Sequence, residues 1–319
     1  MAQDKVANEH YVPRAYLDAF ANAKKQCNVF DKINGKFFVA NVQKVLSERY
    51  LYDFEKELIE NFPGVDEQDE QAVEKILGMT IDRYWKNIAR NIESNYQWFS
   101  LKYSWHFLDV YRCAAVQMIR TPKGKKNLLN IYNKVYGKST DERFENIVLA
   151  KELFNILDDN MKSVLLEMLL NEYGHITIGI NDTKTPFVTS DNPIFTMPYI
   201  WDEKKEEMMI CYPVTPTRCL IFHKRNYVDS QLKEVLKEVA FGKFVINDLS
   251  DIMQEAYKRE KELLRKLNPE TRSLQIEDVL VLNTCCVGQA EQYIISNSNS
   301  QESRLWMDSY KDIEKVAYN

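Results

Sequence analysis

The stretch KYSWHFLDVYRCAAVQMIRTP, residues 102–122, carries the pattern that decides the fold. Its apolar residues point in nearly every direction around a helix, which is typical of a helix buried on all sides. Because an unpaired buried polar group costs about 1–3 kcal/mol, polar residues in such a helix must face polar partners, water or a ligand. Five of them recur at spacings of 3, 4, 4 and 3 and form one narrow stripe: His106, Asp109, Cys113, Gln117 and Arg120.

Helical patterning continues on both sides of this stretch, over residues 69–172. Polar or turn-forming residues interrupt it near Ser100, at Thr121–Pro122 and over 137–140, and we expect the last helix of this part to span 141–172. Nine Gly and nine Pro in 319 residues are few for a fold of many short strands, which favours long helices as the main elements.

Shorter β-rich segments flank the helical part. Residues 26–42 predict a hairpin, because Asn34–Gly35 is a turn dipeptide that tolerates positive φ between two runs of strand-forming residues. A short helix over 11–20 precedes this hairpin, and an extended piece over 47–54 follows it. Four further strands are expected after the helices, over 175–180, 186–190, 207–213 and 217–222.

The chain is expected to close with two helices, one over 229–266 with a break near Gly242 and one over 276–296. Before the helical part, residues 61–71 are expected to form a surface loop. The prediction is therefore an α+β fold, mostly helical, in which the N-terminal β-hairpin and a small mixed or antiparallel sheet from segment 175–222 pack on long helices. No linker rich in Pro, Gly or Ser divides the sequence, so we expect a single domain over 1–319. Its parts are a helix and hairpin (1–60), a helical part (69–172), a sheet segment (175–222), closing helices (229–296) and a tail (297–319).

Composition narrows the class of protein. With a net charge of −5, the bulk field gives no reason to expect nucleic acid or an anionic membrane as a partner, although it leaves a local basic groove open. The sequence has no signal-peptide pattern and no run of about 18 apolar residues, so a cytoplasmic protein without a membrane span is expected. Six Cys without a CxxC spacing indicate reduced, buried thiols. Walker, dinucleotide-binding and nucleophile-elbow motifs are absent.

Polar residues outside the stripe have both a structural and a functional interpretation. The strand end Thr189–Pro193 offers Asp191 and Asn192, which form either a binding group or an ordinary Asp turn. His10 precedes a helix start, where it either belongs to a site or packs against that helix. Asn283 lies at the centre of an apolar helix face, either as a satisfied core amide or as a group that orients a site.

Several of these residues stand in motifs that follow one another from about residue 8 to 296. The motifs are His10-Tyr11-Val12-Pro13-Arg14-Ala15-Tyr16-Leu17 with Phe20, Tyr50-Leu51-Tyr52, Gln117 with Arg120-Thr121-Pro122, Thr189-Ser190-Asp191-Asn192-Pro193, Tyr212-Pro213-Val214-Thr215-Pro216, and Asn283 with Ala290. Together they resemble the bacterial domain-of-unknown-function family numbered 4238. Where that family commonly has Pro-Leu-Ser-Pro, this chain has Pro213-Val214-Thr215-Pro216. The resemblance implies a single-domain cytosolic prokaryotic protein and supplies no established reaction.

The first functional hypothesis is an enzyme that acts on a phosphate ester or nucleic acid, in the manner of a nuclease. His10 is the expected general acid or base, because its pKa lies near working pH, and Arg120 is expected to neutralise phosphate charge. Asp191 would orient the imidazole or bind a divalent ion. A metal-free mechanism and a single Mg²⁺ with mostly water ligands both fit. The residues expected to bind or position the substrate are Arg14, Gln117, Asn192 and Asn283.

Two alternatives stay open. In the first, the same polar pocket holds a small anionic ligand without turnover, as a binding or sensing protein of a prokaryotic defence or mobile-element system; the family's patchy occurrence, implied by the resemblance, suits that role. In the second, the protein is a structural or toxin–antitoxin partner without a pocket, and His10, Arg120 and Asp191 lie apart, each satisfied by its own neighbours.

Overall fold

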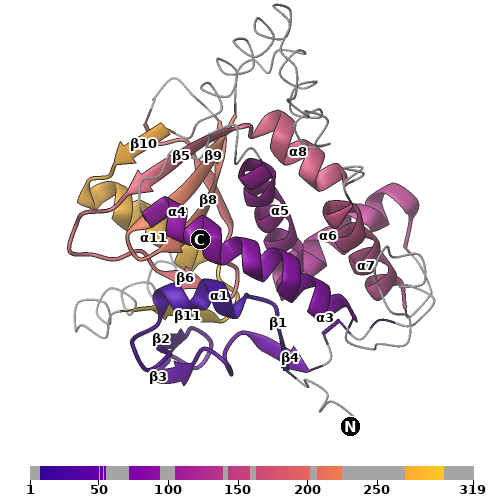
Figure 1. The fold of residues 1–319 in the computed structure, drawn as a ribbon, viewed down its shortest axis with the longest axis horizontal. Coiled ribbons are helices and arrows are strands. Elements are labelled where there is room, and N and C mark those ends of the chain that lie inside the picture. Colours follow the sequence, from indigo (N-terminus) through magenta and orange to yellow (C-terminus); the bar gives the residue numbers. More distant parts are fainter. Residues whose placement is uncertain are drawn as a thin grey trace, which may run out of the picture.

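A computed structural model describes the chain over residues 8–49, 51–52, 54, 72–93, 105–138, 143–158, 163–201, 207–224 and 270–297. In this part, helices pack beside three small sheets, which confirms the predicted α+β class (Figure 1). The helix expected over 229–266, the loop over 61–71 and nearly all of the tail from 297 lie outside the described residues.

The central helix is α5 (Trp105–Arg120), as the sequence predicted. It contacts four other helices, which surround it in Figure 1: α4 (Arg83–Glu93), α6 (Pro122–Tyr136), α7 (Phe144–Leu157) and α8 (Val164–Glu172). Its apolar residues Val110, Tyr111 and Val116 are buried, and so are the polar residues of the stripe from Asp109 to Arg120. His106 lies in α5, but its side chain is not among those described.

The stripe on α5 faces backbone carbonyl groups. Cys113 Sγ lies 3.8 Å from Ile81 O, Gln117 Nε2 donates to Tyr11 O at 3.0 Å, and Arg120 Nη2 donates to His10 O at 2.7 Å. The sequence predicted polar partners, water or a ligand for the stripe, and for these three residues the structure supplies main-chain acceptors of other segments. These bonds offset the desolvation of polar groups in the core.

A long helix leads to α5 and contains one irregular turn. It consists of α3 (Ala72–Leu77), the π-helical turn η2 (Gly78–Asp82) and α4. Within it, Trp85, Ile88 and Ile92 are fully buried. Single π turns inside α-helices occur frequently beside functional sites, and this one ends at Asp82, which lies close to Arg120.

The helix expected over 141–172 is wrong as one element, because the chain forms α7 and then α8. Ser163 caps the second helix: its Oγ accepts the Leu166 N–H at 3.0 Å and donates to Glu152 Oε1 at 2.6 Å. A side-chain cap satisfies an N–H group that a new helix leaves without a partner. The apolar periodicity continues across both helices, which is why the break was missed.

The N-terminal hairpin forms as predicted and joins a larger sheet. A short helical segment, α1 (Arg14–Leu17) with η1 (Asp18–Phe20), precedes it. In the hairpin, β2 (Gln26–Asp31) pairs antiparallel with β3 (Lys36–Asn41), and Gly35 takes φ +62° in the turn. The four-stranded sheet has the order β3-β2-β11-β6 and is completed by β6 (Thr189–Ser190) and β11 (Tyr293–Ser296). Separately, β1 (Asn8–His10) pairs with β4 (Ser47–Arg49).

The segment after α8 forms most of a mixed five-stranded sheet with the order β10-β5-β9-β8-β7. Only β10 is parallel to its neighbour. The strands are β5 (His175–Ile180), β7 (Phe195–Pro198), β8 (Met208–Thr215), β9 (Arg218–His223) and β10 (Glu270–Ser273). The strand expected over 186–190 is reduced to β6, and it belongs to the hairpin sheet instead.

The closing helix expected over 276–296 is too long by seven residues. The helix α11 (Ile276–Gln289) ends at Gln289, and the chain turns back as β11 between β2 and β6. Ile294 and Ile295 are buried in this sheet. Their spacing continues the apolar face of the helix, so local periodicity could not show that they belong to a strand.

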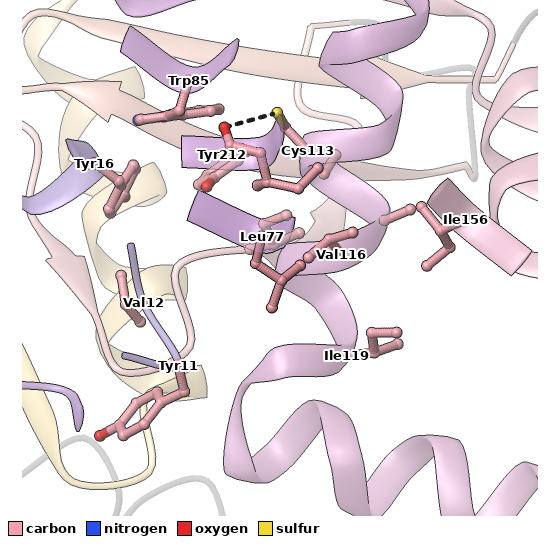
Figure 2. Close-up of a cluster of buried hydrophobic side chains, with 14 of the residues drawn as sticks. Tyr11, Val12, Tyr16, Leu77, Trp85, Cys113, Val116, Ile119, Ile156 and Tyr212 are labelled. Atoms are coloured by element: carbon pink, nitrogen blue, oxygen red, sulfur yellow. Dashed lines mark hydrogen bonds between the residues drawn. The ribbon is translucent and has the colours of Figure 1, made fainter. Parts of the chain in front are cut away.

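One core cluster joins the N-terminal segment, the helices and the five-stranded sheet (Figure 2). At its centre, Trp85 stacks on Tyr212 with ring centroids 4.7 Å apart, and Tyr16 lies 5.3 Å from each of these rings. A second cluster lies between the five-stranded sheet and α11 and includes Phe195, Cys219 and Val287. Aromatic pairs at such distances add about 0.5–1.5 kcal/mol each beyond their buried area.

All six cysteines are free. None of the helices that the structure describes is both long and apolar enough to cross a bilayer.

Asp109 leads to a prediction about pH and stability. Its Oδ2 atom is buried without a hydrogen-bond partner, and burial raises the pKa of Asp109 to about 7, against the partial opposition of Arg112. The folded chain therefore binds a proton more tightly than the unfolded chain, so the free energy of unfolding falls as pH rises from about 4 to 7.

We expect Asp109→Asn to raise the free energy of unfolding by about 1–3 kcal/mol at pH 8 and by much less at pH 5, because the amide carries no charge to desolvate. Urea denaturation of both proteins at both pH values measures this. The exposed Glu172→Gln serves as the matched control. A variant that is less stable than the parent at pH 8 would contradict the prediction.

Candidate functional site

Arg120, at the end of α5, is the most strongly held of the predicted site residues. Only 2% of its surface is exposed. Its Nε donates to the Tyr52 hydroxyl at 2.8 Å, its Nη2 donates to His10 O at 2.7 Å, and its Nη1 lies 3.5 Å from Asp82 Oδ1. Burial alone would lower the pKa of Arg120, but Tyr52, Asp82 and Glu74 around it hold that pKa above its ordinary value. The guanidinium therefore stays charged, and its nitrogen atoms contact groups of the protein itself.

His10 reaches Arg120 through its backbone. The imidazole has a different partner, because its Nε2 is 3.1 Å from Val42 O. Because a carbonyl oxygen only accepts, Nε2 carries the proton of that bond. Burial lowers the pKa of His10, with Arg14 and Arg120 acting in the same direction and the bond to Val42 opposing them. The imidazole is therefore held neutral in one tautomer.

The carboxylate of Asp191 stabilises the turn between α11 and β11. Its Oδ1 accepts the Glu291 N–H at 2.9 Å, and its Oδ2 accepts the N–H groups of Gln292 at 2.6 Å and Tyr293 at 2.8 Å. Burial raises the pKa of Asp191, and the three N–H donors oppose this. Its own N–H donates to Tyr293 O, so backbone and side chain hold the same turn.

The four residues predicted to bind substrate differ in their hydrogen-bond partners and in their exposure to solvent. Asn283 accepts the Val188 N–H and donates to Pro186 O, as a core amide between α11 and the segment before β6. Asn192 accepts from Thr121 Oγ1 and donates to Gln289 O, each at 3.4 Å. Gln117 leaves its buried Oε1 without a hydrogen bond, and Arg14 is exposed on α1.

The three residues predicted to be catalytic are thus bound by different partners. Among the described residues, no hydrogen bond or ion pair joins the His10 imidazole, the Arg120 guanidinium and the Asp191 carboxylate. Arg120 and His10 meet through a carbonyl group, while Asp191 belongs to the α11–β11 turn. The hypotheses about these three residues therefore stay predictions, and a pocket lies beside one of them, Arg120.

Carboxylates that sequence analysis did not select surround Arg120. Glu9 Oε2 accepts the Tyr52 N–H at 2.6 Å, and Asp82 comes from the π-helical turn η2. Burial raises the pKa of Glu74 to about 7; Arg120 lowers it, and the charges of Asp82 and Glu9 raise it further. One buried cation therefore offsets part of the charge of several acids. No three His, Cys, Asp or Glu side chains in the described segments are arranged to hold a metal ion, and the Mg²⁺ stays a prediction.

A pocket of about 350 Å³ lies along α6, beside Arg120. One face of α6 supplies Lys125, Lys126, Asn130 and Asn133 to its wall. Glu48 from β4 and Glu145 from α7 lie on its other sides, and Lys125 Nζ is 3.8 Å from Glu145 Oε2. Apolar surface comes from Leu51, Pro122 and Leu129. The pocket is therefore polar, with both signs of charge, and it is open to solvent at the exposed Lys126 and Asn130.

The position of α6 follows from local sequence. Thr121 caps the helix by accepting the Gly124 N–H at 3.0 Å, and Pro122 occupies the first turn, where its missing N–H is not needed. Gly124 packs against the backbone of Met118, where a side chain has no room. The signal for this pocket was present in the sequence, because residues 122–138 contain five Lys and no Asp or Glu.

The chain belongs to the family described as "Protein of unknown function (DUF4238)", whose model matches residues 8–300 and so covers nearly the whole chain. This confirms the resemblance seen in the motifs. No curated protein and no solved structure gives a significant match.

Several of the family-like motifs contact one another directly. The Tyr16 hydroxyl donates to Pro213 O at 2.7 Å and also bonds to Thr189 Oγ1. Arg120 binds His10 and Tyr52, and Thr121 binds Asn192. Motif residues that are far apart in sequence are therefore joined in pairs by hydrogen bonds inside the fold.

Replacing Arg120 should destabilise the protein. We expect Arg120→Lys to lower the free energy of unfolding by about 3 kcal/mol, because the shorter ammonium group cannot reach Tyr52, His10 and Asp82 at once and leaves buried polar groups without partners. The exposed Arg90→Lys on α4 should change it by less than about 0.5 kcal/mol. Chemical denaturation measures both, and equal effects of the two variants would refute the role given to Arg120.

Replacing Asp191 should loosen one turn. An Asn at this position has one acceptor oxygen where the carboxylate has two, so we expect Asp191→Asn to lower the free energy of unfolding by about 1–3 kcal/mol. In the variant, amide hydrogen exchange should become faster than in the parent at Glu291, Gln292 and Tyr293. Exchange at the amides of β5 should stay the same. Unchanged protection at these three amides would show that the carboxylate does not hold the turn.

Proposed function

We propose that the protein binds a small phosphate ester in the pocket along α6. The observation that carries this proposal is the wall formed by Lys125, Lys126, Asn130 and Asn133 around about 350 Å³. That volume is within the range of small-molecule sites, which is roughly 300–1,000 Å³. Lysine binds phosphate as a point charge, and the amide groups supply further hydrogen-bond donors.

The two carboxylates of the pocket favour a ligand with hydroxyl groups. Glu48 and Glu145 only accept hydrogen bonds when ionised, so a second phosphate beside them would be repelled. A sugar hydroxyl donates to such groups. A nucleotide or a sugar phosphate therefore fits this pocket better than a polyphosphate or an inorganic anion.

Binding without turnover is better supported than hydrolysis. The His10 Nε2 proton, the Arg120 guanidinium and the Asp191 carboxylate are each engaged by protein groups. Hydrolysis by these residues stays a separate prediction, and so does a sensing role in a defence or mobile-element system.

The test is a thermal and calorimetric titration with adenosine 5′-monophosphate, ribose 5-phosphate and inorganic phosphate. We expect at least one ester to raise the melting temperature in a saturable way, because a ligand that binds only the folded state stabilises it. The double variant Lys125→Gln/Lys126→Gln should weaken this binding about tenfold or more, while the exposed Lys44→Gln should not change it.

Two results would count against the proposal: no saturable response of the parent protein to any of the three probes, or equal binding by the double variant. Chromatography of the same mixtures shows whether free phosphate forms. Turnover that is lost in His10→Gln at unchanged stability would favour the hydrolytic alternative.

A further inference from the structure

The outer face of α6 is an unusual surface for this acidic chain. The segment from Pro122 to Lys138 carries five Lys and no acid, although the whole chain has a net charge of −5. Two of these lysines are used inside the protein: Lys123 Nζ donates to Gln289 O at 2.8 Å, and Lys125 lies beside Glu145. Lys126, Lys134 and Lys138 make no ion pair with any described residue, and all three are exposed.

The exposed polar residues of α6 form a line that winds slowly around the helix. Lys126, Asn130 and Lys134 are spaced by four residues, so each lies about 6 Å further along the helix axis and about 40° further around it than the last. Lys138 follows just after the helix, beyond Gly137, whose φ is +83°, and Asn127 is a further exposed polar residue of α6. The line borders the α6 pocket, which shares Lys126 and Asn130 with it.

The chemistry of this face fits a phosphodiester chain. It presents cationic and amide groups, which are the usual side-chain partners of phosphates and of base edges. Tyr136 is 74% exposed in the last turn of the helix, three residues after Asn133 and so on the side of the pocket, where it offers a ring on which a base can stack. A protein partner would use a wider apolar centre than the exposed pair Ile131 and Val135, which lies beside Lys134.

We propose that this face of α6 is a docking surface for a single-stranded nucleic acid, with its phosphates along Lys126, Lys134 and Lys138. This deepens the proposed function and rests on it in one respect: a strand on this face has one of its nucleotides at the pocket. A single strand fits better than a duplex, because its bases are free to reach Tyr136 and the pocket, and because a duplex would bring more backbone charge near an acidic protein.

The experiment uses the full chain and 5′-labelled 12-nucleotide strands of RNA and of DNA, followed by fluorescence anisotropy at several salt concentrations. We expect binding that weakens steeply with salt, because phosphate contacts release counterions. The double variant Lys134→Gln/Lys138→Gln should bind about five- to tenfold more weakly and with a shallower salt dependence. The control Lys24→Gln/Lys44→Gln removes the same charge from exposed positions on the N-terminal segment and should bind as the parent does.

Lys134 and Lys138 do not line the pocket, so the two proposals can fail separately. Loss of small-ligand binding with strand binding intact would remove the proposed function alone. The docking proposal is overturned if the parent protein binds no strand, if both double variants bind equally, if a duplex of the same sequence binds as tightly, or if the protein binds phosphatidylserine vesicles and no strand.

Discussion

The buried guanidinium of Arg120 is the interaction on which much of the remaining arrangement depends. It lies where four segments meet: the end of α5, the strand β1, the segment at Tyr52 and the π-helical turn at Asp82. A charge in the interior is tolerated only when it is paired and hydrogen-bonded. Each of these segments supplies part of that pairing, so none can move without exposing the charge to an apolar surrounding.

The same logic explains why the family-like motifs are recognisable over the whole chain. The motifs supply partners to one another: Tyr16 to Pro213, Arg120 to His10, and Thr121 to Asn192. Several of the acceptors are main-chain carbonyl groups, which every residue type carries. The donors, in contrast, must have a particular length and charge. The donors therefore place a stricter demand on residue type than these acceptors do.

The sequence predicted features that depend on local order. The spacing of residues 102–122 gave a buried central helix with a polar stripe, and Asn34–Gly35 gave the hairpin. The short strands β1 and β10 were missed because their partners are distant in sequence, and β7 because its four residues include Pro198 and are too few to show an alternating pattern. The stripe showed that Gln117 and Arg120 are buried polar groups, but not which carbonyls they bind. The pocket was missed because its lysines resemble an ordinary solvated helix face.

The π-helical turn η2 has a consequence for the helix that contains it. Buried Val73, Leu77, Ile81 and Trp85 follow one another at intervals of four. In a regular α-helix, each such step moves the side chain about 40° around the axis, so four residues would drift away from a common line. A wider turn cancels part of this drift. If the same residues formed a regular α-helix without the wider turn, Trp85 would therefore be rotated away from Tyr16 and Tyr212, although every amino acid of the aromatic stack would still be present.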